Sequence, residues 1–323
     1  KLTKKMFAIE EFVIYASRRE ESRDEVPNRV TSILRPVIHI QNPQTAADLI
    51  GISDEVFIQK SQLGGGSPMI RGFATNRVLI VVDGVRLNNA IYREGNIQNI
   101  ISLDPGSIET TEIIFGPGAV VYGSDAIGGV MDFRTKEPLL AGSKKPFFKA
   151  DALSRFSTAD REKTFHLDFN AGTRKVAFLT SINWSDFEDL RMGSRKNNDY
   201  LRPEYVTRIN GQDSVIANHD PRLQVYSGYS QLNTMNKLRF KLSPDIDLVL
   251  ANHYSLLSDV PRYDRLIQYK SGKLRYGDWH YGPQVWMMNN IQLTVGKKNV
   301  LFDEARLTAA HQSYMESRHD RSF

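Results

Sequence analysis

The side chains in this sequence that could perform chemistry do not group into a catalytic or metal-binding pattern. Seven histidines are spread along the 323 residues, at positions 39, 166, 219, 253, 280, 311 and 319. None belongs to an HExxH motif or to another closely spaced ligand pair. His319 and Asp320 are adjacent, but no nucleophile is marked near them, and no pair of carboxylates stands out as general acid and base. The sequence therefore predicts a protein that is not an enzyme, with no catalytic residue, no resident cofactor and no metal site.

Two glycine-rich segments could in principle cradle a phosphate group. They are Gly64-Gly65-Gly66 and the stretch from Gly116 to Gly129. Neither contains the Lys-Ser/Thr of a P-loop, and neither forms a strand–GxGxxG–helix unit. We expect both to be tight turns, because glycines gather where chains pass closely or where the backbone needs a positive φ.

Residues 26–137 have the pattern of a compact mixed α/β domain. Val78–Val82 is a short apolar run that ends at the turn signal Asp83-Gly84. Thr45–Ile50 predicts a short helix, while Glu112–Phe115 and Val130–Thr135 predict two further strands. Residues 1–25 precede this domain and include a charged stretch that is too polar for a core, so we expect a mobile N-terminal segment.

Residues 146–323 change to a period of two. Apolar side chains alternate with polar ones over 165–171, 176–184, 238–242 and 246–254, which predicts strands with one apolar and one wet face. Their connections alternate between tight turns, at 172–174 and 244–245, and long polar stretches, at 186–233 and 256–283. A membrane β-barrel has this alternation, with short turns on one side and long loops on the other.

The period assigns each side chain of these strands to a face. His166 and His253 are predicted to face the lumen, and Trp184, Tyr254 and Trp286 lie near strand ends, where a membrane barrel carries an aromatic girdle. The side chains expected to point outward to lipid are Phe165, Leu167, Phe169, Val176, Phe178, Ile182, Leu238, Phe240 and Leu242. Seven strands follow residue 145, and an unfinished set cannot close in lipid, so we expect further strands outside these residues.

Composition agrees with this architecture and excludes several others. Apolar residues make up 41% of the chain and mean hydropathy is −0.39, and no run reaches the roughly 18 to 20 apolar residues of a spanning helix. Cysteine is absent, which excludes a disulfide scaffold and a thiolate metal site. The net charge is +5, but the basic residues are dispersed among 37 acids, so nucleic-acid binding is not predicted.

The N-terminal region resembles the plug of TonB-dependent receptors. The resemblance rests on motifs in the family's order: Pro68 to Phe73, Val82 to Arg86, Ile108-Glu109 with Glu112-Ile113, and Gly116 to Val130. The stretches Tyr92 to Asn96 and Ser102 to Pro105 look most like the haem, haemoglobin and transferrin-type branch. The resemblance implies an outer-membrane barrel of about 22 strands, here represented by its first strands, with a plug in its lumen and a periplasmic N-terminus.

The resemblance also implies an energy source and an internal lock. Receptors of this family import a scarce nutrient, such as an iron siderophore or haem, with energy that the inner-membrane TonB–ExbB–ExbD complex draws from the proton-motive force. Glu11, Phe12, Val13, Ile14, Tyr15 and Ala16 resemble the TonB box, whose extended, β-branched character suits strand addition to a partner. A first structured strand is the other interpretation of this segment. Arg71 matches the family arginine that forms plug–barrel ion pairs, but Phe115 stands where the family has a second basic residue.

A polar segment after the Asp83-Gly84 turn is predicted to contact the ligand at the outer face. The candidate residues are Arg77, Asn88, Asn89, Tyr92, Arg93 and Glu94. Tyr92 is the candidate axial ligand for haem, whereas Arg77 and Arg93 suit an anionic iron chelate through charge-assisted hydrogen bonds. Two alternatives remain open at this point: a carbohydrate or peptide importer of the same architecture, and a soluble β-fold enzyme or adhesin.

Overall fold

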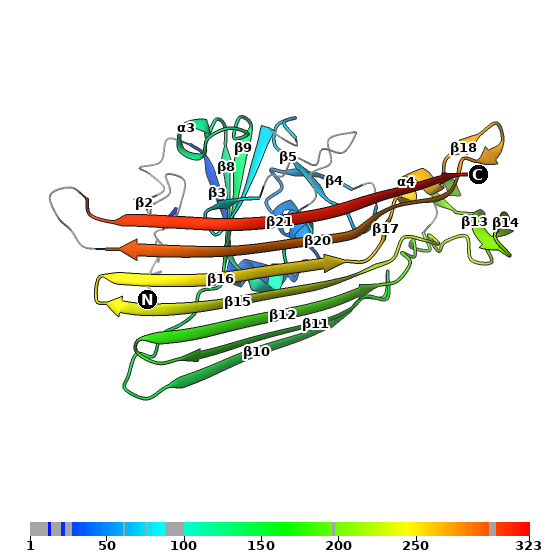
Figure 1. Ribbon diagram of the computed structural model, residues 1–323. Coiled ribbons are helices and arrows are strands. Elements are labelled where there is room, and N and C mark those ends of the chain that lie inside the picture. Colours follow the sequence, from blue (N-terminus) through cyan, green and yellow to red (C-terminus); the bar gives the residue numbers. More distant parts are fainter. Residues whose placement is uncertain are drawn as a thin grey trace, which may run out of the picture.

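The computed structural model describes residues 28–60, 62–74, 77–87, 100–195, 198–296 and 302–323, together with the backbone of Phe12–Val13 and Glu21–Ser22. It contains two structural parts that lie against each other (Figure 1). We call residues 30–135 the N-terminal unit and residues 147–322 the strand wall. No helix within the described residues is long and apolar enough to cross a membrane.

The N-terminal unit is built on a five-stranded sheet in the order β3-β8-β9-β6-β7. β6 and β9 run parallel, and the other neighbours are antiparallel. The strands are β3 (Val30–Leu34), β6 (Val78–Val82), β7 (Val85–Arg86), β8 (Ile108–Phe115) and β9 (Gly129–Thr135). The accompanying elements are α1 (Arg35–Gln41), α2 (Ala46–Gly51), a pair formed by β4 (Phe57–Gln59) and β5 (Ser67–Met69), a 3₁₀ turn η3 (Pro105–Ser107), and α3 (Ala119–Tyr122).

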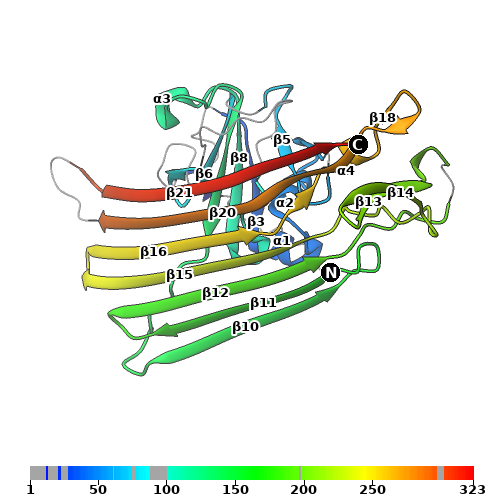
Figure 2. The ribbon, with the colours of Figure 1, turned by 45° about the vertical axis from the view of Figure 1, so that its right-hand side comes forward.

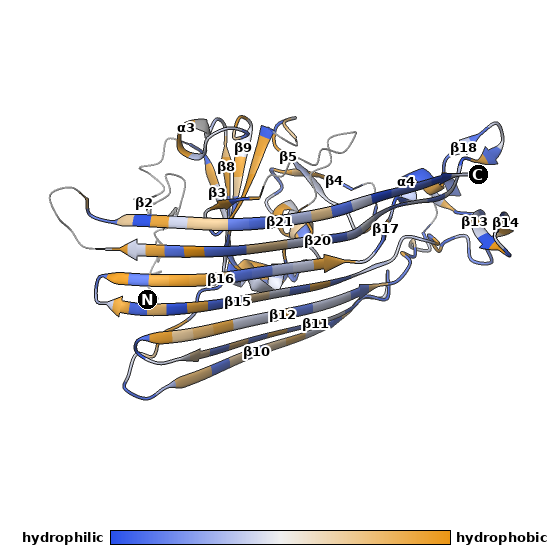
Figure 3. Ribbon diagram, in the orientation of Figure 1, coloured by the Kyte–Doolittle hydropathy of each residue, from blue (hydrophilic) through white to orange (hydrophobic). Residues whose placement is uncertain are grey.

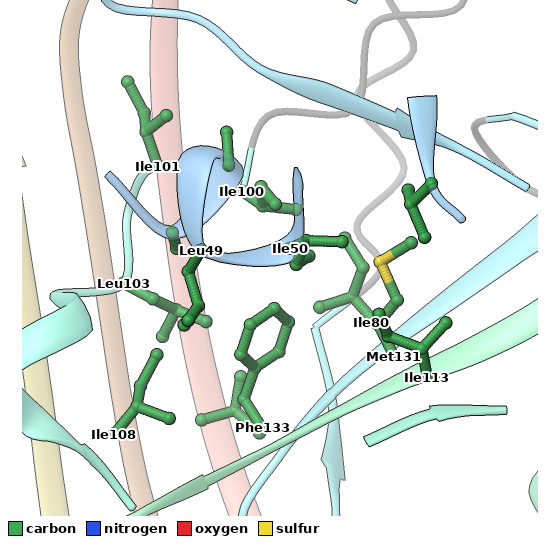
Figure 4. Close-up of a cluster of buried hydrophobic side chains, with 14 of the residues drawn as sticks. Leu49, Ile50, Ile80, Ile100, Ile101, Leu103, Ile108, Ile113, Met131 and Phe133 are labelled. Atoms are coloured by element: carbon green, nitrogen blue, oxygen red, sulfur yellow. The ribbon is translucent and has the colours of Figure 1, made fainter. Parts of the chain in front are cut away.

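Helix α2 shows how local sequence and packing together produce this unit. The Thr45 hydroxyl accepts a hydrogen bond from the Asp48 amide, and the Asp48 carboxylate accepts one from the Thr45 amide, which completes a capping box. The helix then buries Leu49 and Ile50 completely against the sheet. Figure 4 shows this cluster, in which Phe133 lies among isoleucines from several elements. Each fully buried side chain of this size stabilises the fold by about 1.5 to 3 kcal/mol.

The strand wall is a single antiparallel sheet of seven long strands, as the period-two pattern predicted. In spatial order they are β10 (Phe147–Phe156), β11 (Lys163–Gly172), β12 (Val176–Phe187), β15 (Tyr229–Ser243), β16 (Ile246–Leu257), β20 (Tyr276–Val295) and β21 (Ala305–Ser322). The two-residue strand β17 (Val260–Pro261) continues the edge of β16 along β20. The strands of the N-terminal unit run across these long strands in both views (Figures 1 and 2).

The connections of the wall fall at two opposite ends, and this confirms the prediction. Residues 173–175 and 244–245 make the turns at one end, which we call the tight-turn end. Residues 188–228 and 258–275 make the connections at the other, which we call the long-connection end. The first long connection contains η4 (Asn198–Tyr200), β13 (Glu204–Ile209) and β14 (Gln212–Ala217), and the second contains α4 (Tyr263–Leu266), β18 (Tyr269–Lys270) and β19 (Lys273–Leu274).

The sequence underestimated the length of the strands at the long-connection end. β15 begins at Tyr229 and β20 at Tyr276, before the residues where the polar stretches were predicted to end. The reason is compositional. Near this end the strands are polar on both faces, as the hydrophilic colours of β20 and β21 show (Figure 3). A strand without an apolar face gives no period-two signal.

The two faces of the wall are reversed relative to an ordinary globular protein. Along β11, Thr164, His166, Asp168 and Asn170 are buried against the N-terminal unit, whereas Phe165 is 49% exposed. Ile182, Trp184, Leu238 and Leu242 are exposed on the same outer face. Polar side chains therefore form the covered face and apolar ones the uncovered face, as predicted for these strands.

One predicted side-chain position is wrong. Trp286 was expected in an outer aromatic girdle, but it is 3% exposed and faces the N-terminal unit. Its ring lies 5.9 Å from that of His253, and its Nε1 donates a hydrogen bond to Gln312. The prediction took Trp286 to lie near a strand end, but β20 begins at Tyr276, so Trp286 lies in mid-strand, and regular pairing from Gln284 to Val295 sets it on the face opposite the exposed Ile291.

Candidate functional site: the interface between the N-terminal unit and the strand wall

The Asp83-Gly84 turn places the carboxylate of Asp83 at the interface with the wall. Asp83 has φ 49° and Gly84 has φ 79°, the two positive values of the tight turn that Asp-Gly favours between antiparallel strands. This turn joins β6 to β7 and points the Asp83 side chain back into the interface, where it is 4% exposed. The backbone amide and hydroxyl of Thr135 donate to its two oxygens at 2.9 and 2.7 Å.

Two basic side chains of the wall face the same carboxylate. Lys237 of β15 is 1% exposed, and its Nζ lies 3.1 Å from Asp83 Oδ2 and 2.7 Å from Glu137 Oε1. Nε2 of His253, from β16, lies 3.2 Å from Asp83 Oδ2. A buried charge is stable only where opposite charges and hydrogen bonds surround it, and here both partners come from the opposite part of the structure. We call this group the Asp83 cluster.

The pKa of Asp83 reflects this surrounding. Burial by itself would raise the pKa of the carboxyl group, because it disfavours the charged form. The positive charge of Lys237, the imidazole of His253 and the hydrogen bond from Thr135 act in the opposite direction and hold the pKa well below its usual range. Asp83 is therefore charged in the folded protein at neutral pH.

A second ionic group, the His166 cluster, lies between η3, β9 and β11. Nδ1 of His166 is 3.0 Å from Oδ2 of Asp104, and its Nε2 is 3.1 Å from Oδ2 of Asp168. Lys136, which follows β9, donates to Asp168. The chains approach closely here: a Cβ placed on Gly106 would lie 2.7 Å from the His166 ring. A side chain at position 106 would therefore force the imidazole of His166 to move.

Amide side chains of the wall bind backbone carbonyls of the N-terminal unit between and beside these clusters. Gln231 and Asn233 donate to the carbonyls of Ile101 and Ser102 at 2.6 and 2.7 Å. At the neighbouring strands, Gln292 donates to the carbonyl of Asp83 at 2.5 Å, and Gln312 to that of Arg86 at 2.7 Å. Polar groups of the wall thus satisfy carbonyls that would otherwise be buried without partners.

The interface encloses a cavity of about 480 Å³ next to the His166 cluster. Its lining comes from α1, η3 and strands β10 to β12 and includes His39, Asp104, Arg155 and His166. At its rim, Gln44 donates to Glu162 at 2.6 Å and so joins the loop before α2 to the β10–β11 connection. The N-terminal unit and the wall are therefore held partly by discrete polar contacts beside a polar space and partly by an apolar contact, in which wall residues such as Trp286 and Met288 join the core of the N-terminal unit.

The predicted binding residues are only partly covered by the structure. Arg77 is exposed, whereas Asn88, Asn89, Tyr92, Arg93 and Glu94 lie outside the described residues. Of the predicted TonB box, Phe12 and Val13 pair through their backbones with Ser22 and Glu21. Glu11, Ile14, Tyr15 and Ala16 lie outside the described residues.

Arg71 was predicted to form ion pairs between the plug and the barrel, and this role stays a prediction. Arg71 has φ 49°, is exposed, and places its guanidinium 5.5 Å from the centre of the Phe115 ring. Arg29 approaches the same ring at 5.7 Å. Phe115, which replaces the expected basic residue, thus offers these cations an aromatic surface. The Asp83 and His166 clusters provide the buried ion pairs that join the described parts.

Sequence reasoning assigned no anchoring role to Asp83, Lys136 or Lys237. Asp83 was interpreted as a turn signal, and Lys237 only as a polar member of an alternating strand. The sequence did contain a signal for Lys237 and His253. Both occupy inward-facing positions of strands whose inward side chains are mostly polar. A cation buried at such a position requires a carboxylate partner. Which carboxylate that would be was not readable from spacing.

Comparison with known proteins agrees with this arrangement. Residues 22–130 match the TonB-dependent Receptor Plug Domain family. The chain is 39% identical over 172 residues to a vitamin B12 transporter, BtuB, of Vibrio vulnificus, and 33% identical over 132 residues to a hemin receptor of Yersinia pestis. These alignments cover 51% and 41% of this chain but only 27% and 19% of the relatives, so the chain spans well under half of their length.

Solved structures extend the likeness of fold beyond the matched domain. The FrpB iron transporter of Neisseria meningitidis superimposes with a TM-score of 0.66 at 17% identity, covering 89% of this chain and 41% of that one. The hemophore receptor HasR of Serratia marcescens gives 0.64 at 14% identity, covering 91% and 39%. The strand wall therefore corresponds to part of a β-barrel, and the N-terminal unit to its plug. Residues 22–130 are therefore the plug domain of a TonB-dependent receptor, and the chain as a whole has the fold of such a plug with part of its barrel.

Proposed function

We propose that the chain is the plug and part of the barrel of an outer-membrane receptor that imports a scarce nutrient, an iron carrier or haem. The observation that carries this proposal is the reversed wall, with an apolar outer face and a polar inner face on which the N-terminal unit is held by ion pairs. An apolar outer face suits lipid. The polar contacts of this interface suit a plug that must move, because water can replace their hydrogen bonds when the two parts separate.

The cavity beside the His166 cluster supports this function. It already separates α1 from strands β10 to β12, so a small displacement of the N-terminal unit would enlarge a space that exists. We propose that the TonB–ExbB–ExbD complex supplies the force through Glu11 to Ala16, captured by strand addition from the periplasm. The vitamin B12 transporter, the hemin receptor and the iron transporter that resemble the chain support the nutrient class. A carbohydrate or peptide importer of the same architecture is the alternative.

The ligand should first meet the outer face of the N-terminal unit. We propose that Tyr92 and Arg93 contact it there, together with Arg77, Asn88, Asn89 and Glu94. Replacing Tyr92 and Arg93 together by alanine should weaken ligand binding in detergent without reducing expression. Unchanged binding would remove this segment from the site.

A cross-link between the two parts tests the transport mechanism. The chain contains no cysteine, so Gln44→Cys and Glu162→Cys introduce a single pair across the interface, where their present side chains touch. A short, reducible thiol cross-linker should abolish uptake of haem or a ferric chelate by intact cells and leave surface binding unchanged. Reduction should restore uptake.

The matched control is a cross-link within the wall. Thr180 and Asn236 are direct partners on neighbouring strands and are hydrogen-bonded at 2.8 Å. Cysteines at these two positions, linked by the same reagent, should leave uptake near that of the unlinked protein. Normal uptake with the Gln44–Glu162 link in place would show that transport does not need this part of the interface to open.

A further inference from the structure

We infer that the long-connection end of the wall contains an anion-binding subsite, formed by Arg265, Arg275 and Arg318 around Trp279. The subsite would take one anionic oxygen group of a larger ligand, such as a carboxylate or a metal-bound catecholate. This inference rests on the proposed function, because it places the subsite on the path of an imported ligand. It concerns other residues than the polar segment that follows Asp83.

The subsite is a cavity of about 240 Å³ between the second long connection and the ends of β20 and β21. Its lining residues are four arginines and three aromatic residues: Arg262, Arg265, Arg275, Tyr276, Trp279, Tyr281 and Arg318. None of the described residues that line it is a carboxylate. Complete small-molecule sites usually enclose about 300 to 1,000 Å³, so this cavity suits part of a ligand.

The cavity lies on the inner side of the wall. Trp279 and Tyr281 are each 3% exposed and point to the same side of β20 as Trp286 and Met288, which contact the core of the N-terminal unit. Arg318 is paired opposite Tyr281 on β21 and so shares that face. The surrounding strand ends are hydrophilic, which places the cavity beyond the apolar part of the wall (Figure 3).

Arg262 forms the floor and leaves little capacity for a ligand. Its Nε and Nη2 donate to the two oxygens of Asp264 at 2.7 Å, and its Nη1 donates to the Tyr281 hydroxyl at 3.2 Å. Its guanidinium also lies 4.9 Å from the centre of the Trp279 ring. Three of its five N–H groups thus serve to hold α4 against β20.

The other three arginines have donors to spare. The Nε of Arg265 is buried and has no hydrogen-bond acceptor among the described residues; its nearest carboxylate oxygen, on Asp264, is 3.8 Å away. Arg318 lies 4.9 Å from the Trp279 ring and 3.7 Å from Asp320, and Arg275 lies 4.9 Å from the Tyr276 ring. An aromatic face orients a guanidinium group without using its N–H donors, so the N–H donors of these arginines remain available to oxygen anions.

The charge of the site is unbalanced. Four guanidinium groups surround the cavity, and the carboxylates within ion-pair distance of them are those of Asp264 and Asp320. Arg275 and Arg318 are exposed and Arg265 is half-buried, so water screens part of the repulsion among these like charges, and an anionic ligand that joins them would relieve the rest. A neutral ligand would gain no such advantage.

Neutralising two of the arginines tests the inference. The variant Arg275→Gln/Arg318→Gln keeps Arg262 and the α4 contacts, and the control Arg161→Gln/Arg208→Gln removes two exposed arginines from other connections at the same end. Binding to the complete receptor in detergent would be measured for haem, for haem dimethyl ester, and for ferric tris(catecholate). The ester lacks the carboxylates of haem, so the three probes separate the possible sources of the anion.

The cavity variant should lose affinity about tenfold or more for haem, for ferric tris(catecholate) or for both, while the control keeps the affinity of the wild type. Binding of the dimethyl ester should not change. A loss for haem alone identifies a carboxylate, and a loss for the chelate alone identifies a catecholate. Equal losses for all three probes, no loss for any, or a wild type that does not prefer the anionic probes would overturn the inference.

This experiment separates the inference from the proposed function. Binding in detergent needs no energy source, so it reports on the cavity even where transport fails. If wild-type cells bind an anionic probe through these arginines but never accumulate it, the proposed import is wrong and the subsite stands. If the cells accumulate the probe and the cavity variant does so equally well at low ligand concentration, import stands and the subsite is wrong.

Discussion

Replacing Lys237 with methionine removes the cation that faces Asp83 inside the interface. At the observed separation of 3.1 Å, two unit charges attract by about 5 kcal/mol at an effective dielectric constant of about 20. Methionine keeps much of the volume of the side chain, so the change tests charge more than packing. Asp83 would retain its bonds from Thr135 but lose its strongest partner, and breaking a buried pair on one side costs about 3 to 5 kcal/mol.

The reverse change should cost less. In Asp83→Asn, Lys237 keeps Glu137 at 2.7 Å, and Glu137 is 49% exposed, so the ammonium group retains both a partner and access to water. We expect a loss of about 1 to 3 kcal/mol. The double variant Asp83→Asn/Lys237→Met should be more stable than the sum of the two single losses by about 2 kcal/mol, because it leaves no unpaired charge.

The assay is hydrogen exchange of amides in β6 and β9, measured by mass spectrometry across a urea series on the receptor in detergent. These strands carry the Asp83 cluster, so their opening reports the stability of the N-terminal unit on the wall. Lys241→Met is the matched control. Lys241 lies on the same strand, but its partner, Asp247, belongs to the wall itself, and the pair is partly exposed. We expect the control to cost less than about 1 kcal/mol.

Two results would refute this reasoning. If Lys237→Met lowers the stability by less than about 1 kcal/mol, the Asp83–Lys237 ion pair contributes little electrostatic stabilisation to the folded receptor. Additive losses in the double variant would show that Asp83 and Lys237 act independently, and that the position of Lys237 serves packing alone.

Four further outcomes are expected, three from the structure and one, at Ile14, from the sequence. The pKa of Asp83 is lowered in the folded state, so the charged carboxylate stabilises the fold fully above the usual aspartate pKa, and this contribution is lost as the pH falls toward the lowered value. The difference in stability between wild type and Asp83→Asn should therefore stay constant from about pH 8 to 5 and shrink only below about pH 4. Hydrogen exchange at each pH measures this difference. Gly106→Ala should destabilise the N-terminal unit by about 1 to 3 kcal/mol in the same assay, because its Cβ would collide with the His166 ring, and an unchanged value would contradict the close approach. Ile182→Lys, on the outer face, should reduce the stability of the folded barrel in lipid by about 2 to 4 kcal/mol, measured by urea-dependent refolding into vesicles; no effect would argue against lipid at this face. Ile14→Pro should abolish uptake of a labelled ligand by cells while equilibrium binding stays near that of the wild type, and Ile14→Val should be tolerated; a parallel fall in binding would mean that this segment is a structural strand.

The sequence by itself determined the class of architecture. Alternation over residues 165–171 and 176–184 predicted both the strands and the direction of Phe165 and Ile182, because a strand turns successive side chains to opposite faces whatever surrounds it. The ordered motifs from Pro68 to Val130 predicted the family. Connection lengths predicted the two ends of the wall, since an antiparallel strand order places alternate connections on opposite sides.

Local rules also explain why the Asp83-Gly84 turn was predictable and its function was not. The dipeptide itself encodes the two positive φ angles of the turn. The partner of its carboxylate, Lys237, is brought within 3.1 Å only when the whole N-terminal unit is placed against the wall. The same holds for Asp104 and His166, which come from parts of the chain that no local pattern relates.

The tertiary structure alone decided which polar residues of the inner face meet the N-terminal unit and which surround a cavity. Arg262 and Arg318 are distant in sequence, and the register of β20 with β21 sets Arg318 opposite Tyr281, beside Arg262. The irregularity between Tyr281 and Gln284 puts Trp279 and Tyr281 on the same face as Trp286, although their positions in the sequence differ from its position by an odd number. A sequence pattern fixes the face of a side chain only while the strand is regular, and contacts between separate sheets depend on packing that acts over the whole chain at once.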